Sequence, residues 1–481
     1  MQDTPSPLTP KILAVDLDGT LLRSDMLYET FWAAFGQDWT TPLRAAGALA
    51  SGGKASLKAG LADAAEIDVT TLPYDEEVLG YIKAWRDQGG EVWLVTASAQ
   101  ALADQIAEHL GVFAGAMGSD TEVNLKGAQK AEALERKWGR DGYAYMGDAA
   151  ADLPIWAKAR KSITVNASDR LRRQAEAVAA EAEHLSTHRI RAANVARALR
   201  PHQWLKNLLV FLPLLAAHQF GALALWQGVL AFVAFSLIAS SVYVINDLLD
   251  LNADRAHARK KRRPFAAGEV PISWGTGMAA ALVAGGAFIS LFLSMNFMLV
   301  MVVYFATTMA YSLVLKRRAV IDICALAALY TLRILAGGAA TGLALSPWLL
   351  AFSVFFFFSL AAVKRQAELQ DGIARGKLMT VGRDYQAGDL PVVSMMAVSS
   401  GFVSVLVLFL YIQSSDVGAL YSQPAFLGGA CSVLLYWISR VVFLTHRGQM
   451  HDDPVVFAAK DRVTYVSIVL IFFLSVLAAT L

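Results

Sequence analysis

The sequence is poor in cysteine and in charge. Its 481 residues include only two cysteines, Cys324 and Cys431, and charged residues make up 17% of the total. Both cysteines lie in apolar runs, so a disulfide framework and a cysteine-based metal site are excluded. Soluble globular proteins have about 25% charged residues, so a wholly soluble protein is not expected. The 56% apolar content and the net charge of +2 also exclude an intrinsically disordered chain.

The charges that are present are distributed unevenly. Residues beyond 200 hold 20 Lys and Arg against 13 Asp and Glu, whereas the first 200 hold 22 against 27. No secretory signal peptide is apparent, because residues 1–10 are polar and the first apolar run, Ile12–Val15, has only the length of a strand. These patterns predict a domain over residues 1–190 that stays in the cytoplasm, followed by a membrane domain over residues 191–481.

The first domain shows an alternation of strand and helix patterns. Continuous apolar runs before Asp16, over Glu91–Ser98 and before Asp148 are typical of parallel strands that are buried on both faces. Helical patterns occupy Glu76–Gln88, Ala99–Leu110 and Lys130–Trp138. This alternation predicts a doubly wound α/β sheet, in which ligands bind beyond the carboxyl ends of the strands. About 75 residues between the first two strands look like a small helical cap.

Polar residues at these strand ends suit phosphoryl transfer. A carboxylate can attack phosphorus and form an aspartyl-phosphate, and a second carboxylate two residues on can serve as acid and base. The pattern resembles the haloacid dehalogenase (HAD) superfamily of phosphatases, with Asp-x-Asp-Gly-Thr, a strand-end Thr, a Lys and Gly-Asp-x-x-x-Asp in that order. The resemblance implies the following roles: nucleophile Asp16, acid/base Asp18, phosphate ligands Thr96 and Lys126, with Lys130 as the alternative lysine, and Mg²⁺ ligands Asp16, Asp18, Asp148 and Asp152.

The second domain contains long apolar runs of the length that a membrane helix requires, about 20 residues. We predict nine spans: Leu205–Phe220, Ala222–Ile245, Ser273–Leu293, Phe297–Leu315, Val320–Gly338, Pro347–Val363, Val392–Ile412, Ala425–Phe443 and Val463–Leu481. The loops after spans two, four, six and eight carry the basic residues, which is the positive-inside pattern. It places these loops and the first domain in the cytoplasm, at the inner (plasma) membrane.

An acidic motif, Asn246–Asp254, continues the second span. If the helix is unbroken, Asp247, Asp250 and Asp254 fall within an arc of roughly 60°. Three carboxylates on one face repel each other unless a cation lies among them, and Mg²⁺ on a diphosphate is the natural occupant. The basic run that follows, Arg255–Arg263, is suited either to a substrate anion or to lipid head groups.

A second charged face follows the sixth span, where Lys364, Glu368 and Asp371 share one side of a helix. With the acidic motif, it makes the chain from about Leu199 onward resemble the UbiA superfamily of intramembrane prenyltransferases, an all-α bundle of nine helices. That family usually has a second aspartate pair, Asp-x-x-x-Asp, where this sequence has Lys364-Arg365-x-x-Glu368. The variant is more similar to the decaprenyl-phosphate phosphoribosyltransferase branch, which also shows the Arg-Pro-x-Gln-Trp-x-Lys-Asn pattern found at Arg200–Asn207.

The resemblance implies transfer of 5-phosphoribose from phosphoribosyl pyrophosphate to a polyprenyl (decaprenyl) phosphate. Catalysis and Mg²⁺ binding would involve Asp247, Asp250 and Asp254, with Asp371 as a further metal ligand. Substrate binding would involve Lys206, Asn207, Asn246, Arg262, Tyr311, Lys316, Arg333, Lys364, Arg365 and Glu368. The fused phosphatase would then remove the 5-phosphate from the lipid-linked product.

Two alternatives stay open at this stage. One is a prenyltransferase that moves a prenyl group from a prenyl diphosphate to an aromatic acceptor with the same aspartates and Mg²⁺. The other is a lipid-binding or transport protein with a degenerate catalytic loop. The expected partners are the lipid, the donor and the bilayer but no nucleic acid, and the pattern leaves a homo-oligomer open.

Overall fold

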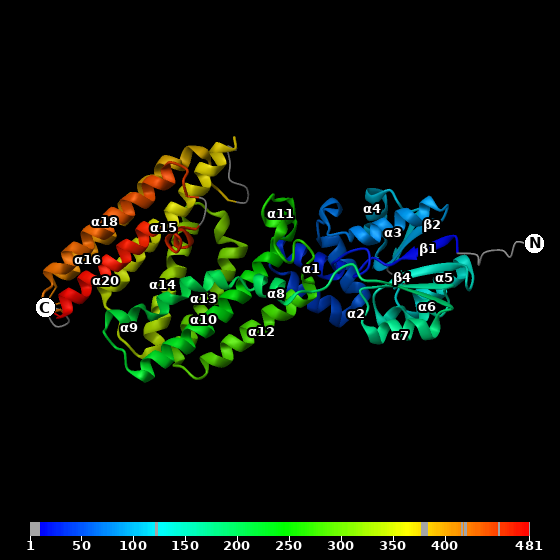
Figure 1. The fold of residues 1–481 in the computed structure, drawn as a ribbon, viewed down its shortest axis with the longest axis horizontal. Helices are drawn as coiled ribbons and strands as arrows, with labels where there is room; N and C mark the ends of the chain where they lie inside the picture. The colour runs from blue at the N-terminus through cyan, green and yellow to red at the C-terminus, as the bar shows by residue number, and fades with distance from the viewer. Residues whose placement is uncertain are drawn as a thin grey trace, which may run out of the picture. The chain divides into compact units, whose positions relative to one another are not determined.

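The computed structural model describes residues 10–120, 124–376, 383–414, 417, 421–450 and 453–480. Figure 1 shows an α/β domain at the amino-terminal end of the chain and long helices in the remainder. Both parts of the predicted fold class are therefore present.

The α/β domain is built on one sheet of six parallel strands in the order β3-β2-β1-β4-β5-β6 within the described residues. Leu13 of the central strand lies opposite Val92 on one side and Ala144 on the other. The strands are β1 (Ile12–Val15), β2 (Glu91–Ala99), β3 (Gly115–Ser119), β4 (Tyr143–Gly147), β5 (Lys161–Val165) and β6 (Glu181–Leu185). The three predicted strands are confirmed, and the strand order reverses between β1 and β4, where such sheets bind ligands.

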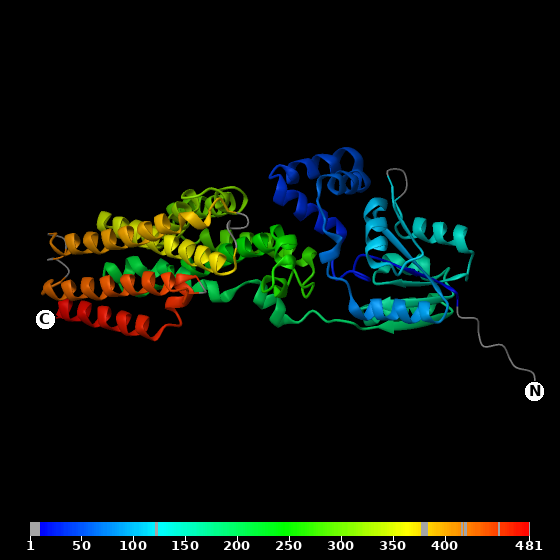
Figure 2. The same ribbon diagram turned by 90° about the horizontal axis from the view of Figure 1, so that it is seen from above.

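Helices cover both faces of this sheet (Figure 2). Leu13 and Val15 face a core shared with α3 and α4, whereas Ala14 faces a second core shared with α5, α6 and α7. Alternate side chains of β1 are thus buried on opposite faces, which explains its continuous apolar sequence. The helices are α3 (Glu76–Asp87), α4 (Gln100–Leu110), α5 (Ala128–Trp138), α6 (Leu153–Trp156) and α7 (Asp169–Val178).

The predicted helical cap is confirmed as α1 (Met26–Gln37) and α2 (Thr41–Ala64), followed by the short η1 (Val69–Thr71). The side chain of Asp25 accepts a hydrogen bond from the backbone N–H of Leu27 and so begins α1. Gly53 interrupts α2 with a φ of 67°, a left-handed conformation that glycine adopts without steric cost.

Eight helices of the described residues are long and apolar enough to cross a membrane. They are α10 (Ala222–Leu249), α12 (Ile272–Ser290), α13 (Met295–Leu313), α14 (Ile321–Thr341), α15 (Pro347–Ala374), α16 (Leu390–Ile412), α18 (Ala425–His446) and α20 (Arg462–Thr480). The first predicted span, Leu205–Phe220, is instead a 3-10 run, η3 (Pro201–Phe211), followed by five-residue α9 (Leu212–Ala216). Lys206 and Asn207 are buried here, so this segment carries polar contacts, and the count of nine is not confirmed.

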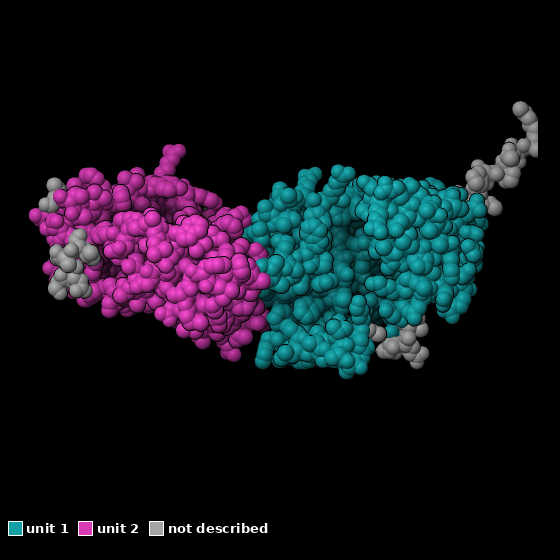
Figure 3. All heavy atoms as spheres, turned by 90° about the horizontal axis from the view of Figure 1, so that it is seen from below, with its two compact units in different colours: residues 1–200, 243–281 teal, residues 201–242, 282–481 magenta. Residues whose placement is uncertain are grey.

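The chain divides into two compact units, coloured in Figure 3. Unit 1 contains residues 1–200 and 243–281, and unit 2 contains residues 201–242 and 282–481. Helix α10 passes from unit 2 into unit 1, so the acidic motif belongs to the same unit as the α/β domain. The boundary predicted at residue 190 stays a prediction.

A glycine fixes the packing of η3 in unit 2. A Cβ at Gly337 of α14 would lie 2.0 Å from the carbonyl oxygen of Val210. Because no side chain fits at that distance, η3 and α14 approach to backbone contact only with glycine at this position.

We expect Gly337→Ala to lower the stability of the protein by about 1–3 kcal/mol, because η3 must move away from α14. Gly372→Ala is the matched control, since a Cβ there meets no described atom within 4 Å and alanine favours a helix. Thermal unfolding in detergent measures both effects, and equal melting temperatures for the two variants would contradict the packing argument.

Candidate functional site

Three carboxylates meet beyond the ends of β1 and β4. Asp16 follows β1, Asp148 follows β4, and Asp152 lies in the short η2 (Ala150–Asp152). One oxygen from each lies within 4.8 Å of the others. Gly19 has a φ of 74°, and a Cβ there would lie 2.3 Å from Asp148 Oδ2. Glycine therefore lets the loop after β1 turn against the Asp148 carboxylate.

The electrostatics of this cluster suit a divalent cation. Burial raises the pKa of Asp148 to about 8, and the negative charges of Asp16 and Asp152 add to the shift. Burial and the charge of Asp16 raise the pKa of Asp152 to about 6. Because close carboxylate oxygens are the ligands that Mg²⁺ prefers, the predicted set Asp16, Asp148 and Asp152 fits this ion. Asp18, the fourth predicted ligand, lies outside that group of three.

Asp18 is held in position for acid and base work. One of its oxygens accepts a hydrogen bond from Ser98 Oγ at 3.0 Å, and the other accepts one from the backbone N–H of Met26 at 2.8 Å. Burial, with the charges of Asp25 and Asp16, raises the pKa of Asp18 to about 7. A carboxyl group with such a pKa can both donate and accept a proton near neutral pH.

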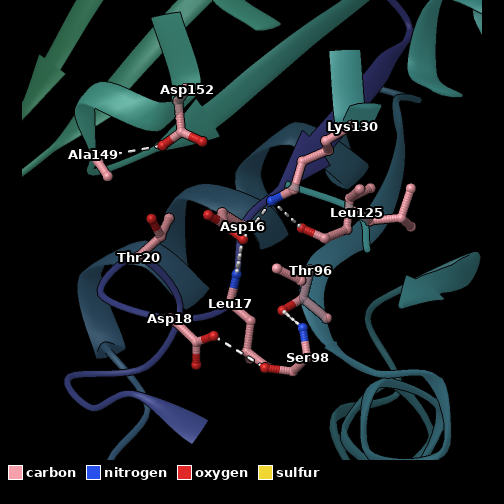
Figure 4. A network of polar contacts seen from close by, with 12 residues as sticks. Asp16, Leu17, Asp18, Thr20, Thr96, Ser98, Leu125, Lys130, Ala149 and Asp152 are labelled. Carbon is pink, nitrogen blue, oxygen red and sulfur yellow. Dashed lines mark hydrogen bonds and ion pairs between the residues drawn. The ribbon is translucent and has the colours of Figure 1, made fainter. Parts of the chain in front are cut away.

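Of the two candidate lysines, the structure places Lys130 against the nucleophile (Figure 4). Lys130 Nζ lies 2.8 Å from Asp16 Oδ1 and also donates to the carbonyl of Val95 and to Tyr145 Oη. Lys130 is 2% exposed, whereas Lys126 is exposed and lines the cavity beside the site. The geometry therefore favours Lys130, the alternative in the sequence, because its charge is fixed beside Asp16.

The sequence assigned phosphate binding to Thr96, but Thr96 and Ser98 differ in their access to the cavity. Thr96 is fully buried, and its hydroxyl oxygen accepts a hydrogen bond from the backbone N–H of Ser98 at 3.0 Å. Ser98 lines the cavity and contacts Asp18. The sequence pattern gave no weight to Ser98, although it follows Thr96 by two residues on the same strand.

The acidic motif does not form one unbroken helix. Helix α10 ends at Leu249 and α11 begins at Leu251, with Asp250 between them at φ −99° and ψ 13°. The prediction of a continuous helix is therefore wrong at Asp250. Within the described residues, Asp16, Asp148 and Asp152 each bring one carboxylate oxygen within 4.8 Å of the others. The three aspartates of the acidic motif are not gathered this closely.

Two of the three aspartates nevertheless lie together on an arginine. Arg263 Nη1 lies 3.1 Å from Asp247 Oδ1 and also contacts Asp254 Oδ2, while Arg200 contacts Asp247 Oδ1 as well. Asp247 and Asp254 are 2% and 1% exposed. Arginine thus compensates the negative charge of this buried pair. Arg263 belongs to the basic run predicted to bind a substrate anion or lipid head groups, whereas the sequence assignment did not include Arg200.

Three oxygens of this motif are buried without a hydrogen bond in the described part of the chain: Asp247 Oδ2, Asp254 Oδ1 and Asn246 Oδ1. Lys260 Nζ lies 4.0 Å from Asp254 Oδ1 and adds positive charge beside that oxygen. Burial raises the pKa of Asp254, although Arg263 opposes the shift. Buried carboxylate oxygens without a donor are costly, so this donor set fits Mg²⁺.

A basic pair in unit 2 shares one aspartate. Lys206 Nζ lies 2.9 Å and Lys364 Nζ 3.1 Å from Asp453 Oδ2. Burial raises the pKa of Asp453, but the charges of Lys364 and Lys206 outweigh it and hold that pKa below its usual range. The sequence assignment did not include Asp453, and the structure shows that this residue contacts both lysines.

Asn207 and Arg333 lie together in the same unit. Arg333 Nε donates to Asn207 Oδ1 at 3.0 Å, and Asn207 Nδ2 donates to Ser236 Oγ at 3.0 Å. The Arg333 guanidinium also lies 5.2 Å from the ring centroid of Tyr304 and 5.5 Å from that of Tyr330. Arg333 is 4% exposed, so these contacts fix its charge within the helices.

Arg365 and Glu368 belong to one polar network, in which Arg365 and Asp322 are buried and Glu368 is partly exposed. Arg365 contacts Asp322 and Glu368, and its Nη2 lies 3.2 Å from Tyr311 Oη. Arg383 lies 3.4 Å from both acids, and Tyr385 Oη donates to Asp322 at 2.6 Å. The sequence assignment omitted Asp322, Arg383 and Tyr385 because nothing in their local sequence marks them.

Three predicted residues lie elsewhere. Asp371 is exposed and pairs with Arg375 one helical turn on, at 2.7 Å. Arg262 is exposed, and Lys316 is partly buried beyond the end of α13. The i, i+4 pairing accounts for Asp371, so the structure gives no support to its role as a metal ligand.

The comparisons with known proteins identify the families of both parts of the chain. Residues 207–476 match the UbiA prenyltransferase family, and residues 13–157 match the haloacid dehalogenase-like hydrolases. An uncharacterized protein of Sinorhizobium fredii is 39% identical over 458 residues, covering 94% of this chain and 88% of its own length. The chain therefore belongs to the UbiA prenyltransferase family, and it is a UbiA-family transferase with a fused HAD-type phosphatase.

Two further likenesses cover parts of the chain. The decaprenyl-phosphate phosphoribosyltransferase of Mycobacterium tuberculosis is 44% identical over 187 residues, 37% of this chain and 60% of the relative. A solved structure of a UbiA homologue from Archaeoglobus fulgidus bound to GPP and Mg²⁺ is 15% identical, with a TM-score of 0.46, and the match covers 59% of this chain and 99% of that one.

We expect Lys130→Met to lower kcat for 4-nitrophenyl phosphate by about 10²–10³-fold, because the fixed positive charge beside Asp16 is lost. Lys126→Met is the matched control and should stay within about threefold, since that charge is exposed. The assay follows release of 4-nitrophenol by the full-length protein in detergent. The reverse ranking of the two variants would restore Lys126 as the phosphate-binding lysine.

We also expect Mg²⁺ binding at the Asp16 cluster to release about one proton at pH 7, because Asp148, with a pKa of about 8, is protonated without the ion. Its affinity should rise from pH 6 to pH 8 as the carboxyls lose their protons. Isothermal titration calorimetry in two buffers of different ionisation enthalpy measures the release. Asp148→Asn should abolish it, and a pH-independent affinity would contradict the proposed ligand set.

Proposed function

We propose that the transferase part moves 5-phosphoribose from phosphoribosyl pyrophosphate to a polyprenyl phosphate. The observation that carries this proposal is the basic pair of Lys206 and Lys364 on Asp453. Lys364 opens the segment where the family usually has its second aspartate pair. Lysines bind phosphate groups directly, whereas the second aspartate pair of the family helps Mg²⁺ to hold a prenyl diphosphate. The similarity to decaprenyl-phosphate phosphoribosyltransferases supports the same assignment.

The reaction needs positioning more than it needs a strong base. An oxygen of the acceptor phosphate, which is already ionised, attacks C1 of the ribose, and the bond from C1 to the pyrophosphate oxygen breaks. We assign the donor pyrophosphate to Asp247, Asp250 and Asp254, with Mg²⁺ supplying positive charge when it is bound. Arg263 and Arg200 already lie on this motif. Charge neutralisation and orientation then account for the rate.

We propose that the phosphatase part removes the 5-phosphate from the lipid-linked product. Asp16 attacks phosphorus while Asp18 gives a proton to the ribose oxygen that leaves. Asp18 then accepts a proton from the water that cleaves the aspartyl-phosphate, and inorganic phosphate is released. Ser98 and the Met26 N–H hold Asp18 for both transfers.

We place both sites in the cytoplasm. A buried contact between Glu29 of the cap and Arg255 beyond α10 requires that the phosphatase domain and this loop lie on one side of the membrane. The basic residues after α10 favour the cytoplasmic side. The water-soluble donor is available there, and the lipid acceptor is available from the bilayer.

The donor is tested by labelling. Membranes that contain the protein should incorporate label from radiolabelled phosphoribosyl pyrophosphate into lipid. A prenyltransferase would instead transfer radiolabelled prenyl diphosphate to an aromatic acceptor. Incorporation of the prenyl label alone would overturn the proposal.

We expect Asp250→Ala to reduce transfer of the labelled phosphoribosyl group by at least about 10²-fold, because the Mg²⁺ that compensates the charge of the donor pyrophosphate would lose a ligand. Asp371→Ala removes an exposed aspartate of a surface pair and should leave transfer within about twofold. A carrier protein would retain lipid binding in both variants and show no turnover before mutation. An equal loss of phosphoribosyl transfer in both variants would contradict the assignment of the donor site to the acidic motif.

A further inference from the structure

The phosphatase cavity has a wall that comes from the transferase. The cavity of about 580 Å³ is lined by Asp16, Asp18 and Lys130 and also by Pro271, Ile272 and Ser273. We call Pro271–Ser273 the wall segment. All of these residues belong to unit 1. Ile272 is the first residue of α12, which is long and apolar enough to cross a membrane. The phosphatase site therefore opens beside the start of a membrane-spanning helix.

A buried ion pair fastens the cap of the phosphatase to the transferase. The Arg255 guanidinium contacts Glu29 Oε2 at 3.0 Å and Oε1 at 2.6 Å, and Ser24 Oγ donates to Glu29 Oε1 at 2.6 Å. Arg255 Nε also donates to the carbonyl of Ala266, close before the wall segment. Both side chains of the pair are at most 3% exposed. A buried ion pair stabilises the fold only when its geometry is good and further hydrogen bonds satisfy its polar atoms. Here Ser24 and the Ala266 carbonyl provide such hydrogen bonds.

Two further contacts hold the wall segment in place. Trp32 Nε1 of α1 donates to Thr276 Oγ1 at 3.0 Å, one turn beyond Ile272. Gly268 has a φ of 66°, and a Cβ there would lie 2.8 Å from Arg23 Cβ. The transferase loop and the loop after β1 therefore pack to backbone distance. The wall segment is fixed by contacts on both sides and is part of the phosphatase site, not a neighbour of it.

The cavity is lined by apolar side chains and by charges of both signs. Five carboxylates and five cations line it: Asp16, Asp18, Asp25, Asp148, Asp152, Arg23, Lys54, Lys58, Lys126 and Lys130. Lys130 already neutralises Asp16, and further lysines line the cavity: Lys54, Lys58 and Lys126. The apolar lining comes from both parts of the chain: Leu27, Leu49, Leu57 and Ile272. A small sugar phosphate would leave these apolar side chains without contact. A phosphate monoester with a second anionic group and an apolar chain would use both features.

We propose that Pro271, Ile272 and Ser273 are specificity-determining residues of the phosphatase, which selects a phosphate monoester anchored in the membrane by a lipid chain. The second anionic group is the phosphodiester that joins the sugar to the lipid. This inference rests on the proposed function for the identity of the sugar. It adds that residues of the transferase part line the cavity in which the lipid-linked ester reaches Asp16.

The test uses the full-length protein in nanodiscs and three synthetic substrates. Farnesyl-phosphoryl 5-phosphoribose carries a lipid chain, methyl-phosphoryl 5-phosphoribose has the same head group without it, and 4-nitrophenyl phosphate lacks both. Phosphate release should show a kcat/KM at least about 10²-fold higher for the farnesyl ester than for the methyl ester, because contacts with the chain contribute to transition-state binding.

Ser273→Trp fills the cavity at the wall segment and should lower kcat/KM for the farnesyl ester by at least about tenfold. The loss for the farnesyl ester should exceed the loss for 4-nitrophenyl phosphate in the same variant by at least about tenfold, and the remaining 4-nitrophenyl phosphate hydrolysis shows that the site is folded. Gly277→Trp is the matched control, because residue 277 lies one turn further along α12, does not line the cavity and has open space around it. Ser273→Leu, a smaller change, should give an intermediate loss.

Three results would overturn the inference: equal kcat/KM for the farnesyl and methyl esters, equal losses for all three substrates in Ser273→Trp, or the same loss in Gly277→Trp. The substrates are synthetic, so the outcome does not depend on the transferase. If labelled phosphoribosyl pyrophosphate fails to label lipid while the farnesyl ester is still preferred, the proposed transfer is wrong and the lipid selectivity stands. If phosphoribosyl pyrophosphate labels lipid but the farnesyl and methyl esters are hydrolysed equally well, the proposed transfer stands and the proposed lipid selectivity is wrong.

Discussion

The burial of like charges is the constraint on which both sites depend. Asp16, Asp148 and Asp152 have oxygens within 4.8 Å of one another, and Asp247 and Asp254 are almost fully buried. Carboxylates in such positions are stable only with compensating charge. The protein supplies fixed cations to each group, Lys130 to the first and Arg200 and Arg263 to the second. The remaining oxygens define where a metal ion and a phosphate-bearing substrate can bind.

The same principle links the two enzymatic parts. Glu29 and Arg255 are separated by 226 positions in the chain and form a buried, doubly hydrogen-bonded pair. Arg255 follows Asp254 of the acidic motif, and Glu29 lies in α1, whose first residue, Met26, donates its backbone N–H to Asp18. Helix α1 therefore contacts both the loop beyond α10 and Asp18.

Local patterns predicted much of the architecture. Continuous apolar runs identified β1, β2 and β4, because both faces of the sheet are covered, and long apolar runs identified eight helices of membrane-spanning length. The run that includes Leu205 failed as a span because composition does not distinguish a helix in lipid from a 3-10 segment that places Lys206 and Asn207 among buried partners. The break at Asp250 was also missed, since no proline or glycine marks it.

The sequence by itself determined which chemical groups are present and in what order: the aspartates of both motifs, the lysines and the apolar spans. Only the tertiary structure decided which of them meet. It placed Lys130 rather than Lys126 on Asp16, put Asp453 between Lys206 and Lys364, and brought the wall segment into the phosphatase cavity. Periodicity and motif spacing record neighbours along the chain, whereas these contacts join residues tens to hundreds of positions apart through the packing of helices and strands.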